Sequence, residues 1–393
     1  MMGKVSAPYW CAGVLACTST GEDARTPVYK HPILPTSPNF FLSCGMVFAI
    51  NYSMMKTITL PPRIVARFKK KYTDVVGLEL GSGLSGVPAV RIIKGKQGFE
   101  IKAVGILDML DTLPQTLEAA NASEEIPSWS LPKAFCAPHA ALAVTSKWNF
   151  LRHTSGPNEE IPEKKKCEYR DLRRTFAPDM PELVAGLPEF QAGWATSLFP
   201  EGRAPTACSL QISQLAIMNS FNQHPAVKNA TGSSVGLFVS SQSTALVAFQ
   251  NRLPVLYREF PLGTSHVQQE VASKMQLAPI LVQQLLDEDA MDASPYFESI
   301  LKPLFRQVEI MNDYLSRRRN LPATNYFISG ALLGARYWHA MFIKIVGKEL
   351  THCRPFEGIP MAKDAVVLPD KLESVESLFT AAAGAALAVM EES

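Results

Sequence analysis

The sequence predicts an α/β fold in which one unit occurs twice. VGLELGSGLS at 76–85 aligns without gaps on VGLFVSSQST at 235–244. Each copy is followed by two more segments rich in apolar and β-branched residues, joined by short turns that contain Gly or Asn. Helical patterns follow both copies further along the chain. A repeat of this kind indicates a duplicated unit, so the 393 residues should hold two related domains.

The turn after the first predicted strand contains a glycine motif. Gly81, Gly83 and Gly86 match the G-x-G-x-x-G pattern of dinucleotide-binding Rossmann units. In such units a helix begins at the glycines, whereas here the segments 87–94 and 99–107 read as two further strands. We therefore interpret the motif as a hairpin turn whose backbone N–H groups can hold phosphate.

The last part of the chain supplies the remaining elements. NYFIS at 325–329 predicts a buried strand, with a small-residue turn and a helix behind it. The segment 372–390, rich in Ala, predicts a C-terminal helix packed under the second domain, with Gly384 allowing close approach. Two strand-turn-strand-strand units, each joined later by helices, are typical of the actin-like (ribonuclease H-like) α/β fold, in which two duplicated domains face each other across a nucleotide cleft.

We expect the following domain organisation. Residues 1–54 lack sustained periodicity and form a poorly ordered extension upstream of Met54 or Met55, while VLAC at 14–17 leaves a lipoprotein signal as the alternative. The remaining ranges are 55–146 with 201–232 for the first domain (1A), 147–200 for a subdomain inserted into it (1C-like), 233–270 with 316–393 for the second domain (2A), and 271–315 for subdomain 2B.

Composition excludes several classes of function. A net charge of +2 and short, scattered basic clusters give no indication of nucleic-acid binding. No apolar run reaches the roughly 18 to 20 residues that a membrane-spanning helix needs. Seven cysteines without a C-x-x-C pair indicate reduced thiols. Cys136 and His139 have C-x-x-H spacing, but a zinc site needs a second pair of ligands.

In these motifs the chain resembles the PilM family, actin-like cytoplasmic proteins of type IV pilus assembly that are related to the division protein FtsA. The resemblance covers about residues 55–390. It rests on two phosphate turns, a long helix, an adenosine turn and three connecting segments, which are GLELGSG at 77–83, GLFVSSQSTALVAF at 236–249, the segment 295–315, FISGALLG at 327–334, a helix at 209–221, a strand and helix at 258–277, and RPFEGI at 354–359.

The resemblance implies a nucleotide site for ATP and Mg²⁺, with Glu79 as the metal ligand. Carried over position by position, the implied nucleotide-binding residues are Glu79, Gly81, Ser82, Gly83, Ser240, Ser241, Gln242, Ser243, Gly263, Ser329, Gly330 and Ala331.

The chain departs from the family pattern at three turns. In the first phosphate turn, Glu79 is longer by one methylene than the usual Asp. The Asp-Ile-Gly of the second phosphate turn is replaced by Phe238, Val239 and Ser240, so a carboxylate and a glycine are missing. In the adenosine turn, Ala331 and Leu332 stand where glycines are expected and crowd the space for a purine. We therefore predict a scaffold with a degenerate nucleotide site and no catalytic residues, with weak ATP binding and ATP turnover as the open alternatives.

The resemblance also implies a protein partner. A PilN-like inner-membrane protein would place its cytoplasmic N-terminal tail in an apolar groove of the first domain, so the chain would lie at the cytoplasmic face of the inner membrane. Candidate groove segments are the strand from Ile101 to Ile106 and the helix near Leu215, which core packing explains equally well. Self-association, an FtsA-like division protein and a sugar or acetate kinase on the same fold are left open, as is membrane contact by the basic stretch 61–72.

Overall fold

The computed structural model describes eleven segments of the chain, which are residues 72–82, 86–96, 98–108, 129–146, 148–154, 168–174, 182–251, 253–287, 290–330, 332–368 and 372–391. The predicted N-terminal extension 1–54, the basic stretch up to residue 71, Gly83 and Ala331 lie outside the described residues. In the described part of the chain, no helix is long and apolar enough to cross a membrane.

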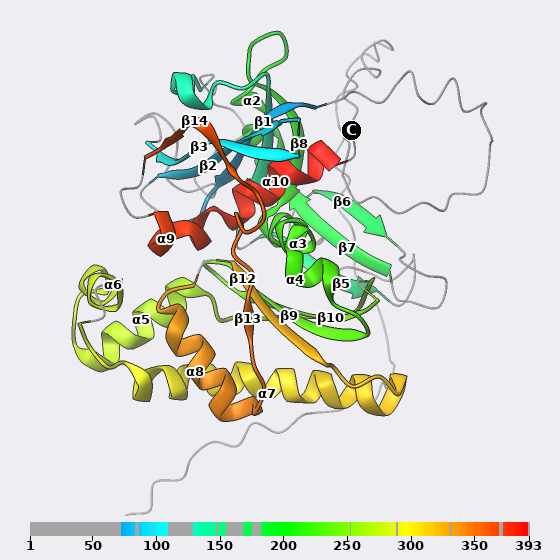
Figure 1. Cartoon of the computed structure of the whole chain (residues 1–393), viewed down its shortest axis with the longest axis vertical. Coiled ribbons are helices and arrows are strands. Elements are labelled where there is room, and N and C mark those ends of the chain that lie inside the picture. The colour runs from blue at the N-terminus through cyan, green and yellow to red at the C-terminus, as the bar shows by residue number, and fades with distance from the viewer. Residues whose placement is uncertain are drawn as a thin grey trace, which may run out of the picture. The chain divides into compact units, whose positions relative to one another are not determined.

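A six-stranded sheet forms the first half (Figure 1). The first three strands make an antiparallel meander, and two more lie parallel to the first strand on its other side. The order is β14-β3-β2-β1-β4-β8. The strands are β1 (Asp74–Leu80), β2 (Val87–Lys94), β3 (Phe99–Leu107), β4 (His139–Val144), β8 (Thr206–Ile212) and β14 (Met361–Val367).

The second sheet repeats this arrangement with five strands in the order β11-β10-β9-β12-β13. Its first three strands again form an antiparallel meander, and β12 runs parallel to β9 as β4 does to β1. The duplicated strand pattern of the sequence is therefore confirmed. The strands are β9 (Ser233–Val239), β10 (Thr244–Gln250), β11 (Leu253–Phe260), β12 (Asn325–Gly330) and β13 (Thr351–His352).

A small antiparallel sheet lies between β4 and β8 in the sequence, in the order β5-β7-β6. Its strands are β5 (Phe150–Thr154), β6 (Tyr169–Arg174) and β7 (Glu182–Pro188), and α2 (Glu189–Ser197) follows directly. The sequence predicted an inserted subdomain here, at 147–200.

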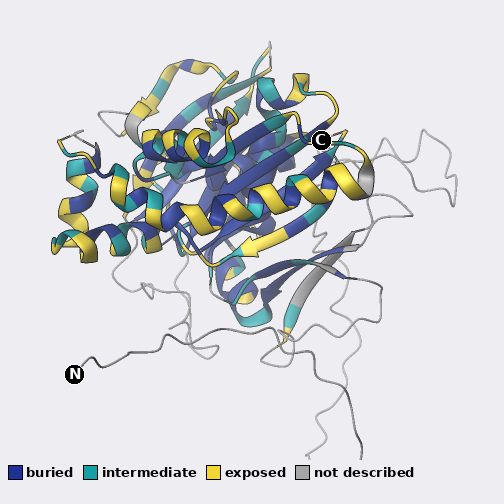
Figure 2. Ribbon diagram, turned by 90° about the horizontal axis from the view of Figure 1, so that it is seen from below, coloured by how far each residue is buried: buried dark blue, intermediate teal, exposed yellow. Residues whose placement is uncertain are grey.

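Helices cover the second sheet and form one core with it. Figure 2 shows the longest helix, α7, exposed on its outer side, with dark blue, buried strands behind it. The helices of this half are α5 (Thr264–Met275), α6 (Pro279–Asp287), α7 (Ser294–Arg319) and α8 (Ala335–Val346). Residues of α5 and α7 share a buried cluster with β9 and β10. The predicted boundaries of a separate subdomain at 271–315 are therefore wrong, because they cut through α5 and α7.

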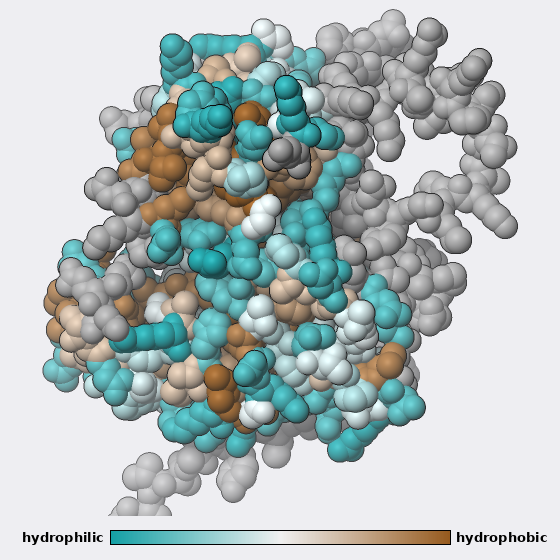
Figure 3. All heavy atoms as spheres, in the orientation of Figure 1, coloured by the Kyte–Doolittle hydropathy of each residue, from teal (hydrophilic) through white to brown (hydrophobic). Residues whose placement is uncertain are grey.

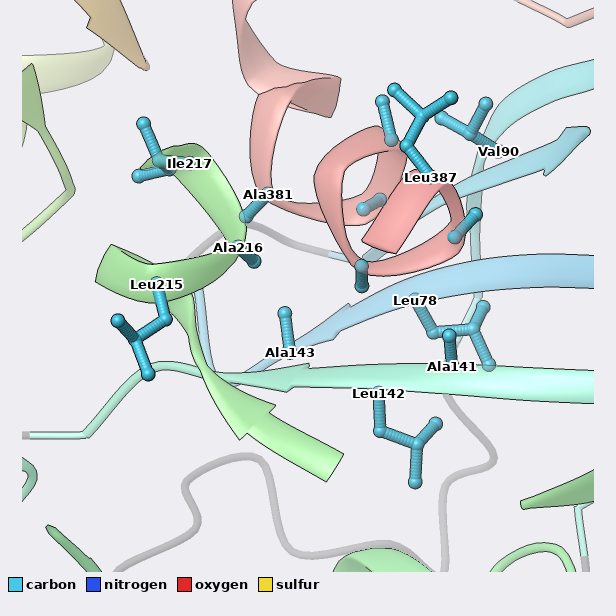
Figure 4. Close-up of a cluster of buried hydrophobic side chains, with 14 of the residues drawn as sticks. Leu78, Val90, Ala141, Leu142, Ala143, Leu215, Ala216, Ile217, Ala381 and Leu387 are labelled. Carbon is cyan, nitrogen blue, oxygen red and sulfur yellow. The ribbon is translucent and has the colours of Figure 1, made fainter. Parts of the chain in front are cut away.

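The C-terminal helix belongs to the first sheet. After α9 (Leu372–Val375) and the 3₁₀ turn η3 (Glu376–Phe379), helix α10 (Thr380–Glu391) packs against β1, β2 and β4 on one side. On the other side it meets α3 (Ser213–Gln223), which a short helix, α4 (Pro225–Asn229), follows. Figure 4 shows α10 between α3 and the strands, among buried Leu and Ala side chains. The expected packing under the second domain is therefore wrong, and β14 and α10 have to be reassigned to the first half.

Two glycines explain why α10 fits there. A Cβ on Gly384 would overlap the backbone carbonyl of Ala216 in α3, and a Cβ on Gly77 in β1 would overlap that of Ala382. Every residue of α10 from Thr380 to Met390 is buried. The helix therefore touches its neighbours backbone to backbone, which only Gly and Ala permit.

The sequence predicted a single helix at 209–221, but this segment consists of the end of a strand followed by a helix. Ser209 to Ile212 complete β8, which pairs in parallel with β4, and the helix begins at Ser213. Hydrogen bonding to β4 makes these four residues a strand. The helical spacing of apolar residues from 215 to 221 contains no information about this pairing.

We predict that Gly384→Val lowers the free energy of unfolding by about 3 kcal/mol or more, because the new side chain meets the Ala216 backbone, which cannot move aside. The control is Gly193→Ala on α2, where a Cβ meets no atom within 4 Å; it should change stability by about 1 kcal/mol or less. Urea unfolding measures both. Equal stability of the two variants would contradict the packing described for α10.

Candidate functional site

A cavity of about 470 Å³ lies where the turns after β1 and β9 approach α5 and the end of β12. Its far wall comes from η3 and the first turn of α10. The size is typical of a small-molecule site. Five of the residues predicted from the sequence line it, which are Glu79, Ser82, Ser240, Ser241 and Gly330.

The carboxylate of Glu79 lies in a buried network of hydroxyl groups, at the edge of the first sheet where the parallel strands have their carboxyl ends. The Thr145 hydroxyl donates to Glu79 Oε1 at 2.8 Å, and Ser213 Oγ lies 2.6 Å from Thr145 Oγ1. Thr145 follows β4 and Ser213 follows β8, so both stand beside the end of β1 because the three strands are parallel. The sequence analysis missed Thr145 and Ser213, although a polar residue directly after each parallel strand is the signal that could have found them.

Burial controls the charge of Glu79. The residue is only 8% exposed, and desolvation raises the pKa of its carboxyl to about 7, while the hydrogen bonds from Thr145 and Ser213 act in the opposite direction. Near neutral pH, protonated and ionised forms are therefore present in similar amounts.

The second turn, from Ser240 to Ser243, is closed by its own hydrogen bonds. Ser240 N donates to Ser243 O at 2.9 Å, and Ser243 N donates to Ser240 Oγ at 3.1 Å. The Ser243 hydroxyl donates to a carboxylate oxygen of Glu259 at 2.6 Å and does not line the cavity. Gln242 is exposed outside the lining.

The start of α5 is bonded to this turn. Thr264 N donates to Ser240 O and Ser265 N donates to Ser241 O, both at 3.0 Å. Gly263 allows the approach, since a Cβ there would overlap the Ser241 carbonyl. These two N–H groups of a helix N-terminus would otherwise be available to an anion.

The remaining predicted residues shape the backbone around the cavity. Gly81, with φ of 77°, turns the chain after β1. Gly330, with φ of 108°, lies so close to Val239 that a Cβ would overlap the Val239 carbonyl. Ser329 is fully buried and its hydroxyl donates to Cys353 O at 3.3 Å. Leu332 lines the cavity without filling it.

Phe238, which stands where the family pattern would place a second carboxylate, belongs to an aromatic cluster. It is 1% exposed, and its ring meets that of Phe221 edge to face with centroids 5.0 Å apart. Phe249 and Phe327 also pack on Phe221. The position therefore supplies core packing, with no polar atom for metal or water.

The described residues do not fit a magnesium–triphosphate complex. Among those that line the cavity, Glu79 is the only ionisable residue, and Lys, Arg and His are absent. Within the described ranges, His, Cys, Asp and Glu form no group of three that could hold a metal ion. Sites for nucleoside triphosphates usually combine a cation with free backbone donors. In the described lining there is no cation, and the N–H groups of Ser240, Thr264 and Ser265 are already bonded.

The two segments predicted as a groove for a partner lie mostly in the core. Ile101 and Val104 are fully buried and Leu215 is 5% exposed, so these side chains are not available to a partner. Ile106 is the exception at 36% exposed. Figure 3 shows hydrophobic, brown side chains gathered where Figure 1 places β2, β3 and β14. The large exposed apolar residues of β14 and of the position after it are Met361, Val366, Val367 and Leu368.

Comparison with known proteins gives matches in structure alone. No protein-family model and no curated protein sequence matches the chain. A solved structure of a PilM–PilN type IV pilus biogenesis complex superposes with a TM-score of 0.59 at 15% identity, over 80% of this chain and 98% of that one. The chain has an actin-like fold.

Two other solved structures are less similar to this protein. A Bacteroides thetaiotaomicron protein with an actin-like ATPase fold gives a TM-score of 0.39 at 9% identity, covering 72% of this chain and 92% of that one. An archaeal actin homologue gives 0.36 at 12% identity, covering 81% and 100%.

Glu79 makes the stability of the protein depend on pH. Because its pKa rises from 4.5 to about 7 on folding, the folded state binds the proton more tightly, and stability falls as pH rises between these values. Glu79→Gln removes this effect. We predict that the variant gains up to about 3 kcal/mol relative to the natural protein between pH 4.5 and pH 8, measured by urea unfolding.

The control for this experiment is Glu349→Gln, which removes one negative charge from an exposed residue. Its stability relative to the natural protein should stay constant over the same pH range. A parallel response of both variants would mean that net charge, and not the burial of Glu79, causes the effect.

Proposed function

We propose that this protein is a PilM-like scaffold of a type IV pilus or related secretion assembly. In this role it binds the cytoplasmic N-terminal tail of a PilN-like inner-membrane protein. The superposition on the PilM–PilN complex supports the proposal, because it takes in 98% of that chain and therefore both halves of the fold. The chain would thus work at the cytoplasmic face of the inner membrane, held there by its partner.

We also propose that this scaffold does not hydrolyse ATP. Hydrolysis on this fold needs carboxylates on both phosphate turns to hold magnesium and water. Here the first turn offers Glu79 alone, and the second places Phe238 inside an aromatic cluster. The same shortage of carboxylates argues against a kinase. ATP binding without turnover would remain compatible with a scaffold.

The outer edge of β14 is our candidate for the surface that receives the tail. β14 is the last strand of the first sheet, and among the described residues no strand pairs with its outer side. An extended tail can add to such an edge as a further strand, with its side chains on neighbouring apolar residues. Val366 and Val367, both 40% exposed, and Leu368, 52% exposed, would supply those contacts.

We predict that Val367→Lys weakens binding of a synthetic PilN-like tail about tenfold or more, since a charge would be placed in an apolar contact. The control is Ile343→Lys on α8, an exposed apolar residue of the second half, which should bind as the natural protein does. Fluorescence anisotropy of a labelled tail measures both. Equal affinities would exclude the β14 edge, and absence of binding to the natural protein would contradict the proposed partner.

The proposed lack of turnover gives a second prediction. With ATP and Mg²⁺, phosphate release by the protein should not exceed that of Glu79→Ala, because the second turn has no carboxylate to position magnesium and the attacking water. A colorimetric phosphate assay compares the two. Release that exceeds the buffer background and disappears in Glu79→Ala would establish an ATPase.

A further inference from the structure

β14, the strand that we propose as the tail-binding edge, pairs irregularly with its own sheet. The register against β3 shifts between Met361 and Val366, so that these two residues and Val367 are the paired positions. An exposed ion pair between Lys102 and Asp364 spans the shifted part, and such pairs contribute little to stability. The start of β14 therefore needs a further constraint if its edge is to keep one conformation.

The connection from Cys353 to Pro360 supplies this constraint. It joins β13 of the second sheet to β14 of the first (Figure 1). At its beginning, Cys353 N donates to Ile328 O on β12 at 2.8 Å. At its end, Ile101 N on β3 donates to Pro360 O at 2.9 Å. Each end is thus bonded to its own sheet, and side chains from other elements hold the middle.

His224 holds the middle of the connection from the first half. It lies between α3 and α4, is 3% exposed, and its Nε2 is 3.1 Å from Oε2 of Glu357. Its Nδ1 accepts a hydrogen bond from Ala226 N at 3.2 Å, which caps α4. Because Nδ1 is an acceptor, the proton of the neutral ring is on Nε2, where it faces the carboxylate of Glu357. One imidazole therefore joins the start of α4 to the connection.

Neighbouring residues fit the connection closely to the rest of the molecule. Gly358, with φ of 84°, lies against Pro225 of α4, where a Cβ would come within 2.9 Å of Pro225 Cγ. Phe356 N donates to Oε1 of Glu376 in η3 at 3.1 Å, and Glu376 is 8% exposed. The Phe356 ring also stacks on Phe379, with centroids 6.2 Å apart. The middle of the connection is thus in contact with both α4 and η3.

We infer that His224 is a positioning residue for tail binding: its contact with Glu357 fixes the connection, and thereby the start of the β14 edge. At 3% exposed, His224 is too buried to touch the tail itself. Without the contact, the tail would have to order the connection as it binds, which has a cost in conformational entropy. The inference rests on the proposed tail site and adds a residue that controls it from the interior.

Two substitutions separate the two contacts of His224. In His224→Gln, the side-chain amide N–H can donate to Glu357 as Nε2 does, but the acceptor that caps α4 is lost. In His224→Asn, the side-chain oxygen can still cap α4, whereas the shorter side chain does not reach Glu357. Fluorescence anisotropy of a labelled PilN-like tail measures both. We expect about tenfold weaker binding by His224→Asn, and binding by His224→Gln within about twofold of the natural protein.

The order of the two variants distinguishes positioning of β14 from a merely structural role. If His224 acted by capping α4 alone, His224→Gln would bind the tail more weakly than His224→Asn. The matched control is His266→Asn, which makes the same change at an exposed histidine of α5 in the second half. It should bind the tail as the natural protein does.

Hydrogen exchange of the full chain tests the positioning without any tail. In His224→Asn, the Ile101 N–H that donates to Pro360 O should exchange about tenfold faster, while Thr324 N–H, bonded to Ser233 O in the second half, keeps its natural rate. Equal tail affinity of the two His224 variants, the reverse order, or unchanged exchange at Ile101 would overturn the inference. If the natural protein binds no tail, the proposed function fails, and exchange at Ile101 alone decides the role of His224.

Discussion

The backbone contact of α10 with β1 and α3 holds the first half together and forms part of the cleft. Gly77 and Gly384 allow the helix to approach both neighbours, and any larger residue at either position would overlap a carbonyl group. The same helix begins at Thr380, which lines the cavity. Helix α10 follows the second half in sequence but packs on the first, while η3 touches β2 of the first half and β12 of the second. The chain therefore returns across the cleft, and the shape of the cavity depends on this return.

Within this frame the turns after β1 and β9 differ from each other. The first keeps an acid, but burial in a hydroxyl network brings the pKa of Glu79 close to neutrality. The second turn has Phe238 where the family pattern that the sequence resembles has an acid. Phe238 packs with Phe221 of α3 and so joins the two halves through an aromatic contact. The buried Phe238 therefore supports the proposed role in binding a protein segment more than a role in hydrolysis.

The sequence predicted the duplicated sheets because strands of strong apolar alternation and their turns are encoded locally. The prediction failed where pairing with a strand that is distant in the sequence determines the secondary structure. Residues 209–212 look helical until β4 is placed beside them, and no local pattern revealed β14, which pairs with β3 from the far end of the chain. At the site, Glu79, Ser82 and Gly330 were found by motif. The roles of Thr145 and Ser213, and the raised pKa of Glu79, arise only when separate strands end at one edge.

Native mass spectrometry of the full chain, mixed with a PilN-like tail peptide and Mg²⁺–ATP together, tests the central claim most directly. The claim is that this actin-like fold works by holding a protein segment and not by processing a triphosphate. The account predicts a complex of one chain with one tail and no nucleotide adduct. A chain that carries ATP or ADP and leaves the tail unbound would contradict it.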